Sequence, residues 1–230
     1  MRRTARTMAW LVGATVAAAS AQAGPLPGFA LKAQSEHFSF YSRGNQKIEA
    51  AKSERYLSQI QSLLGQNVSG RAEYYRYETA QELAAGTGTY AEGVTFARAG
   101  QIHSTQDFHA HEIVHLVAGQ MGNPGAFFHE GLAVALGNGG RWHGKDVHKL
   151  ARDAARRSSL SALVAGFARL DADTAYPVAG SFVASLIEQH GIAKVSEFFR
   201  ACTGANTADA FARTFGRTLD QAGEGWAASL

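Results

Sequence analysis

Residues 111 to 115 read His-Glu-Ile-Val-His, which places two imidazoles four positions apart with a carboxylate directly after the first. Positions i and i+4 of a helix lie on one face, one turn apart. We therefore expect the imidazoles of His111 and His115 to reach a single metal ion. Glu112 lies about 100° further around such a helix, so its carboxylate is turned away from that coordination and toward a water beside the ion. The spacing predicts a metal site with a neighbouring base.

A catalytic zinc site needs three protein ligands and an open position, and Glu130 is the candidate for the third ligand. It lies in the largely apolar segment 127–133, which we expect to be helical. The turn sequence Asn-Pro-Gly at 123–125 allows this helix to fold back on the first. Gly131 and Ala133 are small enough for the helices to approach closely. The sequence thus predicts a His₂Glu site whose cofactor is Zn²⁺.

Other assignments fit the sequence less well. His129 is the alternative third ligand and is otherwise expected to be a residue of the cleft. A three-histidine site of the HExxHxxGxxH kind is excluded, because Ala118 and Met121 stand where that motif needs glycine and histidine. An exposed, salt-bridged helix face without metal is the remaining alternative. We expect His109 to be a surface or capping residue, and we expect structural or solvated roles for His103, His143 and His148.

The motif and the segment 127–133 together resemble the gluzincin metallopeptidases, and more closely the small bacterial peptidase-MA-like family. That family has HExxH followed by a short helix reading W-x-x-E-G-x-A, and Phe127 stands here in place of the tryptophan. The resemblance extends over most of the chain, in segments 35–38, 95–104, 175–191 and 215–226. Val134 departs from thermolysin-like enzymes, which have an aspartate there that orients the first histidine. The resemblance implies a zincin-like fold, Glu112 as catalytic base and, as zinc ligands, His111, His115 and Glu130.

The resemblance further implies hydrolysis of a peptide or protein substrate by a zinc-activated water, with Glu112 as general base. Tyr176 is the candidate donor to the oxyanion, because gluzincins often place a tyrosine or histidine after the ligand glutamate; simple packing before Pro177 is the equal alternative. We expect the peptide to add as a strand along residues 93–99. The lack of a Gly-x-Met-Glu-Asn motif favours an endopeptidase. The competing function is a non-catalytic zincin-fold binding module of the cell envelope.

The rest of the pattern predicts a small mixed sheet followed by a mostly helical half. Partial alternation and aromatic content predict strands at 37–41, 71–78, 93–99 and 101–105. Helical spacing of apolar residues, with glycine stops and capping residues, predicts helices at 45–64, 79–86, 107–120, 126–136, 145–157, 159–169, 177–190, 192–201, 207–215 and 218–229. The glycine-rich stretch 137–144 is expected to be a loop. The fold class is therefore α+β, with one domain at 29–230 that divides into a β-containing lobe, 29–120, and a helical lobe, 121–230.

The N-terminal residues 1–23 are expected to be a signal peptide. Three arginines precede an apolar run at 8–19, and the Ala-Gln-Ala sequence at 21–23 suits signal peptidase. We expect cleavage before Gly24, which leaves a short leader at 24–28. The apolar run is too short to be a stable transmembrane helix, although an uncleaved anchor is the alternative. The predicted location is the periplasm or the extracellular space, without stable membrane insertion.

Charge and cysteine usage limit the class of function. Three of the 22 Lys and Arg residues fall in the signal peptide, which leaves 19 basic residues against 19 acidic ones. The mature chain is therefore neutral, and we expect no nucleic-acid partner. The pair Arg156-Arg157 is expected to be part of a solvated helix face. Cys202 is the only cysteine, so an internal disulfide is excluded, and its apolar neighbours predict that it is buried.

Overall fold

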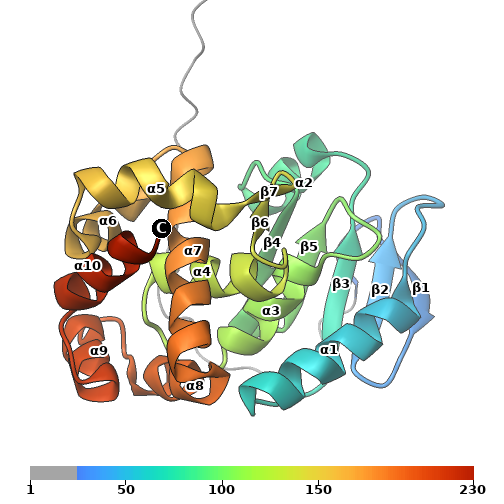
Figure 1. Ribbon diagram of the computed structural model, residues 1–230. Helices are drawn as coiled ribbons and strands as arrows, with labels where there is room; N and C mark the ends of the chain where they lie inside the picture. The colour runs from blue at the N-terminus through green and yellow to red at the C-terminus, as the bar shows by residue number, and fades with distance from the viewer. Residues whose placement is uncertain (1–24) are drawn as a thin grey trace, which may run out of the picture.

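The computed structural model describes residues 25–230 (Figure 1). The signal peptide expected at residues 1–23 and its cleavage point lie outside the described residues. Within 25–230, no helix combines the length with the apolar character that crossing a bilayer requires. In Figure 1 the sheet occupies the right of the molecule and the later helices occupy the left, which confirms a mixed α+β fold with a helical C-terminal half.

A five-stranded mixed sheet forms the N-terminal half. Its strand order is β1-β2-β3-β5-β4, and the strand bounds are β1 (Ala30–Gln34), β2 (Phe38–Ser42), β3 (Ala72–Arg76), β4 (Gly93–Phe96) and β5 (Gln101–Ser104). β2, β3 and β5 run parallel to one another, whereas β1 and β4 are antiparallel edge strands. β1 is missing from the sequence-based prediction, because its side chains are mostly exposed and lack an apolar alternation.

Alternate side chains of the sheet pack into two apolar layers. Phe38, Phe40 and Tyr74 belong to the main core, which also contains apolar residues of the first and third helices. Tyr75 faces the opposite side, where it packs in a smaller cluster with Leu83 of the second helix. The period of two along a strand produces this division. It leaves one face of the sheet for the helix that carries the histidine motif.

The helices agree with the predicted periodicity except at some of their ends. Their bounds are α1 (Ala50–Leu64), α2 (Ala80–Thr87), α3 (Ala110–Ala118), α4 (Ala126–Leu136), α5 (Val147–Arg157), α6 (Leu160–Gly166), α7 (Ala172–His190), α8 (Ile192–Ala201), α9 (Thr207–Phe215) and α10 (Leu219–Ser229), with 3₁₀ turns at Ala97–Ala99 and Phe167–Arg169. α1 begins later than predicted. α7 begins before Pro177 rather than at it, because the Asp171 side chain accepts a hydrogen bond from the Thr174 N–H and caps the helix.

A two-stranded hairpin spans the end of the stretch 137–144, which was expected to be only a loop, and residues 145–146, which were predicted to begin a helix. Its strands are β6 (Arg141–Trp142) and β7 (Lys145–Asp146), which pair antiparallel. The two residues between them have left-handed backbones, with φ of 48° at His143 and 77° at Gly144. Two consecutive left-handed residues form the turn that best suits the twist of a short hairpin. The glycine content of this stretch predicts a loop but does not reveal the defined turn within it.

Helices α4 and α7 pack closely in the centre of the helical half. A Cβ atom at Gly131 would lie 2.5 Å from the Ala179 carbonyl oxygen, and one at Gly180 would lie 2.3 Å from Cγ1 of Val134. Only glycine permits this approach. The main core continues from the sheet through these helices to Trp226 of α10.

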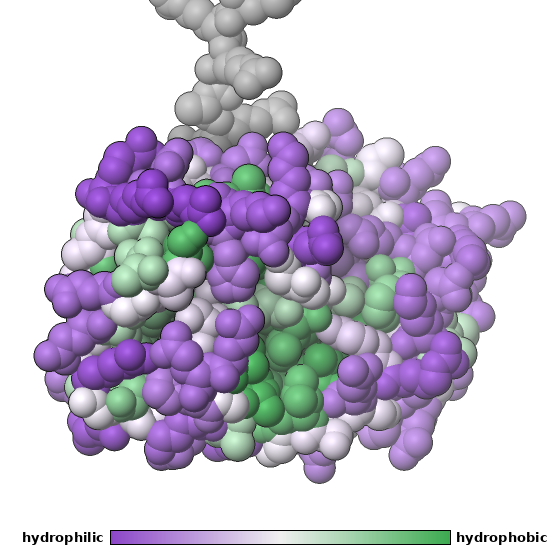
Figure 2. Space-filling model, in the orientation of Figure 1, coloured by the Kyte–Doolittle hydropathy of each residue, from purple (hydrophilic) through white to green (hydrophobic). Residues whose placement is uncertain are grey.

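The outer surface of the helical half is mainly polar. Figure 2 shows polar side chains over α5 at the upper left, whereas apolar side chains gather lower in the middle of the same face. Arg156 and Arg157 are exposed in the last turn of α5, which confirms the predicted solvated face. Cys202 is buried, also as predicted, and burial raises the pKa of its thiol to about 11.

Candidate metal site and cleft

Helix α3 is held in place by its apolar side chains. Five of them are completely buried, namely Ile113, Val114, Leu116, Val117 and Ala118. The remaining face of the helix carries His111 and His115, which lie one turn apart. The helix therefore has one orientation against the core, and that orientation directs both imidazoles toward α4.

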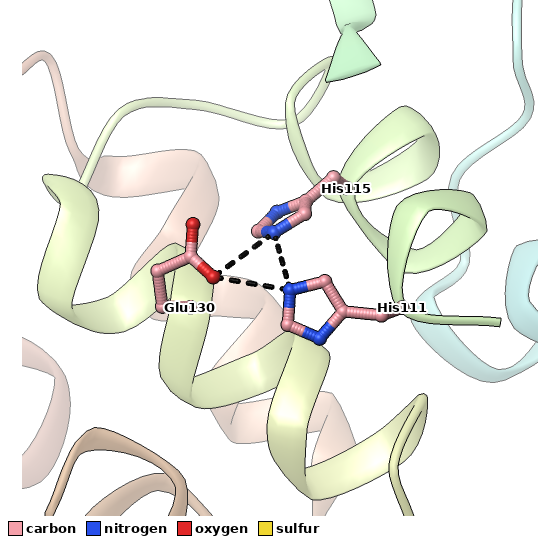
Figure 3. A group of neighbouring side chains, drawn as sticks. All are labelled: His111, His115 and Glu130. Carbon is pink, nitrogen blue, oxygen red and sulfur yellow. Dashed lines mark hydrogen bonds and ion pairs between the residues drawn. The ribbon is translucent and has the colours of Figure 1, made fainter. Parts of the chain in front are cut away.

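Helix α4 supplies the carboxylate that faces these imidazoles. Phe127, Phe128 and Leu132 are buried in the core, and the left-handed backbone of Gly125, with φ of 92°, begins the helix after the turn. Glu130 is 5% exposed and points at the two histidines (Figure 3). The close contact of α4 with α7 fixes the position from which this carboxylate extends.

The three donor atoms form an almost equilateral triangle. The separations are 3.0 Å between the two Nε2 atoms, 3.1 Å from His111 Nε2 to Glu130 Oε2, and 3.3 Å from His115 Nε2 to Glu130 Oε2. Zinc–ligand bonds of about 2.0–2.2 Å at tetrahedral angles place neighbouring ligand atoms about 3.3–3.6 Å apart, close to these separations. The triangle fits such an ion, and this is one of the groups of side chains within 25–230 whose donor atoms gather closely enough to hold a metal.

Hydrogen bonding alone does not account for this triangle. Two imidazole Nε2 atoms carry at most two N–H groups, and each N–H points along the outward bisector of its ring. Three mutual contacts among these atoms therefore cannot all be linear hydrogen bonds. Lone pairs that converge on one shared point are the arrangement that a cation stabilises. The chemistry of the donor set, two imidazoles and a carboxylate, suits zinc.

The charges in this buried group support one another. Burial raises the pKa of Glu130, but the positive charges and hydrogen bonds of His115 and His111 outweigh that effect and hold the pKa well below its usual range. Burial lowers the pKa of His115, but the charge and hydrogen bond of Glu130 and the charge of Glu112 raise it overall to about 9. The carboxylate is therefore ionised at neutral pH, as a metal ligand must be, and a bound metal would displace the proton from His115.

Glu112 lies beside this triangle and is held by the edge strand β4. The Thr95 hydroxyl donates a hydrogen bond of 2.7 Å to Glu112 Oε2 and also contacts the Glu112 carbonyl oxygen at 3.1 Å. Gly93 leaves the room that the carboxylate needs, because a Cβ there would lie 2.7 Å from Glu112 Cγ. Glu112 is 5% exposed. The sequence indicates this glutamate but not its partner, because Thr95 belongs to a different element.

A cleft runs across the site between β4 and the start of α7. Two adjoining cavities of about 490 and 310 Å³ share Ala91, Gly93, His111, Glu112 and Tyr176. Aromatic side chains line the larger cavity, and small side chains and β4 line the smaller one. His111 and Glu112 therefore lie at the junction of the two cavities, and His115 and Glu130 line the smaller one, so a substrate that crosses the cleft would pass the site.

Tyr176 is part of the cleft wall. Its ring centroid lies 6.3 Å from that of His111. Burial, together with the negative charges of Glu130 and Glu112, raises the pKa of the Tyr176 hydroxyl well above its ordinary value, so the group is a hydrogen-bond donor at neutral pH. The structure brings this tyrosine to the ligands and the base, although Pro177 follows it within the helix.

Trp142 is a cleft residue that the sequence analysis does not identify. It lies on the β6–β7 hairpin and stacks on Tyr176, with ring centroids 4.5 Å apart and planes inclined by 7°. Its indole N–H donates a hydrogen bond of 2.9 Å to Asp173 Oδ1. The only signal in the sequence is a large aromatic residue in a glycine-rich stretch close after the ligand helix.

Two histidines near the motif line the cleft, as was expected of His129 but not of His109. His109 was expected at the surface or as a cap. It has the capping position of α3 without a side-chain capping bond, and instead lines the larger cavity and contacts Ser104 Oγ at 2.9 Å. Burial lowers the pKa of His109. His129 is outside the donor triangle; it lines the smaller cavity and packs edge-on against Phe199.

The other histidines have the structural or solvated roles that were expected. His103 is buried between Tyr75 and Tyr77, and burial lowers its pKa to about 4. His148 contacts Ser181 Oγ at 2.9 Å, whereas the side chain of His143 is 72% exposed at the rim of the larger cavity.

Val134 is completely buried against α7. A side chain in that environment packs and does not orient an imidazole.

No model of a protein family matches this sequence, and no curated protein matches it significantly. The case for a function therefore rests on the site itself.

Proposed function

We propose that this protein is a zinc-dependent peptidase of the gluzincin, peptidase-MA-like type, with a zincin-like fold. The observation that carries the proposal is the triangle of His111 Nε2, His115 Nε2 and Glu130 Oε2, whose sides measure 3.0–3.3 Å. His₂Glu is an established ligand set of hydrolytic zinc sites, with a fourth position open for water. The neighbouring carboxylate of Glu112 supplies the base that such a site needs.

Each cleft residue has a role that follows from its chemistry. Zinc held by the triangle would supply Lewis acidity, which lowers the pKa of a water and polarises the scissile carbonyl. Glu112 accepts the proton of the attacking water and then delivers it to the leaving amine. Thr95 donates to one carboxylate oxygen of Glu112, which leaves the other oxygen for that proton. The Tyr176 hydroxyl, a donor at neutral pH, stabilises the developing oxyanion.

The substrate is proposed to be an extended peptide or protein segment. β4 is an edge strand, so one row of its backbone N–H and C=O groups is free of sheet partners and available to an added strand. Gly93 and Thr95 of β4 line the cavities beside the base. A cleft that extends to both sides of the site accepts residues on both sides of the cleaved bond, which favours an endopeptidase.

The test is zinc content and peptide hydrolysis in the same preparation. We expect the purified mature protein to contain one zinc ion and to cleave casein, and we expect a chelator to abolish the cleavage. Glu112→Gln should keep its zinc and lose activity by about 10²–10⁴-fold, because only the proton acceptor is removed. Glu188→Gln, an exposed change on α7, is the matched control.

The possible results separate the candidate functions. Bound zinc without hydrolysis by the wild-type protein would favour a non-catalytic binding module. Full activity in Glu112→Gln would refute the assignment of the base. Export is part of the proposal, and N-terminal sequencing of protein recovered outside the cytoplasm, beginning at Gly24, tests it.

A further inference from the structure

The β6–β7 hairpin holds an aromatic side chain against the proposed oxyanion donor. Trp142 and Tyr176 are almost parallel, with centroids 4.5 Å apart and an angle of 7° between their planes. Both residues line the larger cavity together with His111 and Glu112. An aromatic pair in this geometry attracts beyond what the area that it buries contributes. The stack is therefore strong enough to select one position of a ring.

A hydrogen bond fixes the tryptophan in turn. The Trp142 indole N–H donates to Asp173 Oδ1 at 2.9 Å. Asp173 lies in the first turn of α7, three residues before Tyr176. Residues at i and i+3 share a helix face, so one face of α7 presents both the acceptor for the indole and the ring on which the indole stacks. His143 also lies 3.5 Å from Asp173, but both of those side chains are more than 70% exposed and contribute little.

The backbone of the hairpin determines the direction of the indole. Trp142 pairs with Lys145 across the two-residue turn. The left-handed conformations of His143 and Gly144 leave no other register for so short a hairpin. The Trp142 side chain consequently extends from β6 toward α7.

Tyr176 depends on ring contacts for its position. Among residues 25–230, its hydroxyl has no hydrogen-bond partner, whereas its ring contacts Trp142, Phe167 and His111. The contacts with Phe167 and His111 have centroid separations of 6.3 Å, so the Trp142 stack is the closest of the three. Immobilising a side chain of this kind costs conformational entropy. A partner that orders it in advance removes that cost from the transition state.

We propose that Trp142, tied to Asp173, is a positioning residue that orders the Tyr176 ring beside the His111–Glu112 side of the cleft. This inference rests on the proposed function, because the ordered hydroxyl matters when an oxyanion forms. The loss of order affects an interaction made in the transition state, so it lowers kcat and leaves KM nearly unchanged. A residue that merely contacted the substrate would change KM instead.

The experiment compares four variants of the zinc-loaded protein by casein-derived peptide hydrolysis. Trp142→Ala and Asp173→Ala should lower kcat about 3–10-fold, with KM within twofold of wild type. Trp142→Phe keeps a stacked ring without the N–H, so its kcat should lie between that of the two alanine variants and that of wild type. Asp173→Asn keeps an acceptor oxygen and should restore most of kcat.

Asp209→Ala is the matched control for Asp173→Ala. Both residues are exposed acids in the first turn of a helix, so both changes remove the same favourable interaction with the helix dipole. Asp209 lies on α9, outside both cavities. We expect Asp209→Ala to keep the wild-type kcat. The Asp173 side chain is 78% exposed, so its replacement leaves the core intact. The comparison of Asp173→Ala with Asp209→Ala therefore remains informative even if Trp142→Ala fails to fold.

Tryptophan fluorescence of the metal-free protein gives a readout independent of activity. Trp142→Phe leaves the emission of Trp226 in the mature protein, and the difference from wild type is the emission of Trp142. We expect Asp173→Ala and Tyr176→Ala to shift that difference spectrum toward the emission of a solvated indole, and Asp209→Ala to leave it unchanged. An unshifted spectrum in Asp173→Ala would refute the claim that the hydrogen bond to Asp173 holds the indole of Trp142 in place.

Different results would refute the proposed function and the positioning role of Trp142. A wild-type protein without zinc-dependent hydrolysis would overturn the proposed function, and this inference with it. An active wild-type protein whose Trp142 and Asp173 variants change only KM, or change neither constant, would overturn the positioning role and leave the function intact. A kcat loss that Asp173→Asn restores supports the inference.

Discussion

Replacement of Gly131 by alanine tests whether the packing of α4 on α7 positions the carboxylate of Glu130. The new Cβ would lie 2.5 Å from the Ala179 carbonyl oxygen and 2.5 Å from Cγ2 of Val183. The valine methyl can rotate away, but a helical backbone oxygen cannot. Since carbon contacts are favourable only at about 3.5–4.0 Å, α4 must move away from α7. That movement carries the adjacent Glu130 out of the donor triangle.

The sign of the stability change follows from two opposing effects. Alanine is a better helix former than glycine by about 0.5–1 kcal/mol in a helix interior. Overpacking of a rigid core costs about 1–3 kcal/mol. The second effect is larger, so we expect Gly131→Ala to be net destabilising by about 0.5–2 kcal/mol. For a domain of this size that lowers Tm by about 1–8 °C.

Zinc affinity should decrease by more than stability does. Ligand distances in a working site hold to within about 0.2 Å, and the required movement of α4 exceeds that tolerance. Even changes that only disturb the orientation of a ligand reduce metal affinity by about 10–100-fold. We expect Gly131→Ala to bind zinc at least about tenfold more weakly than wild type.

The assays are thermal unfolding of the metal-free protein and zinc competition against a chromophoric chelator. Gly225→Ala in α10 is the control, because the nearest atom to its Cβ is Nη1 of Arg217 at 3.8 Å. That variant gains helix propensity without overpacking, so it should be stabilised by about 0.5–1 kcal/mol and keep its zinc affinity. If Gly131→Ala matches wild type in both Tm and zinc affinity, the close approach of α4 and α7 does not position Glu130.

Three further predictions concern the base, the metal and an acid-sensitive contact. Thr95→Val removes the hydroxyl that donates to Glu112 and should lower kcat about tenfold at nearly unchanged KM; an unchanged or higher kcat would mean that Thr95 does not position the base. Zinc at about 100 times its Kd should stabilise the fold by about 2.7 kcal/mol, and chelation should lower Tm by about 5–10 °C, whereas a metal-independent Tm would argue against the site. Burial raises the pKa of Glu54, but hydrogen bonds from Ser35 and His37 outweigh it and lower the pKa. This contact therefore stabilises the protein above the unfolded-state pKa and is lost as pH falls through the lower folded-state value. Glu54→Gln should accordingly be less stable than wild type at pH 7 and converge with it in acid unfolding; an equal deficit at every pH would contradict the ionic contribution.

Much of the fold could be predicted from local pattern. The α+β class, the sheet-first order and the bounds of α4, α8 and α9 follow from apolar periodicity and from glycine stops. The prediction is wrong where local pattern is weak. β1 has mostly exposed side chains and pairs with β2 mainly through its backbone. The start of α7 depends on a cap at Asp171 that competes with the breaking signal of Pro177.

The chemistry of the donor set was likewise evident from residue types alone. His111 and His115 share a helix face by geometry, and small residues after Glu130 allow the second helix to approach. A helical repeat relates residues three and four positions apart, so it predicts which side chains of α3 act together. It says nothing about the residues that other elements bring to them.

The tertiary structure decides how the site is completed. Thr95 reaches Glu112 because the edge strand β4 packs on α3, and His109 enters the cleft, rather than the surface, for the same reason. Trp142 reaches Tyr176 because a two-residue turn, with left-handed backbone at both positions, directs the hairpin onto α7. These contacts join segments that are distant along the chain, and their geometry depends on the packing of the whole core. Sequence spacing therefore identifies the proposed ligands and the proposed base, whereas three-dimensional packing determines the residues that hold them in position.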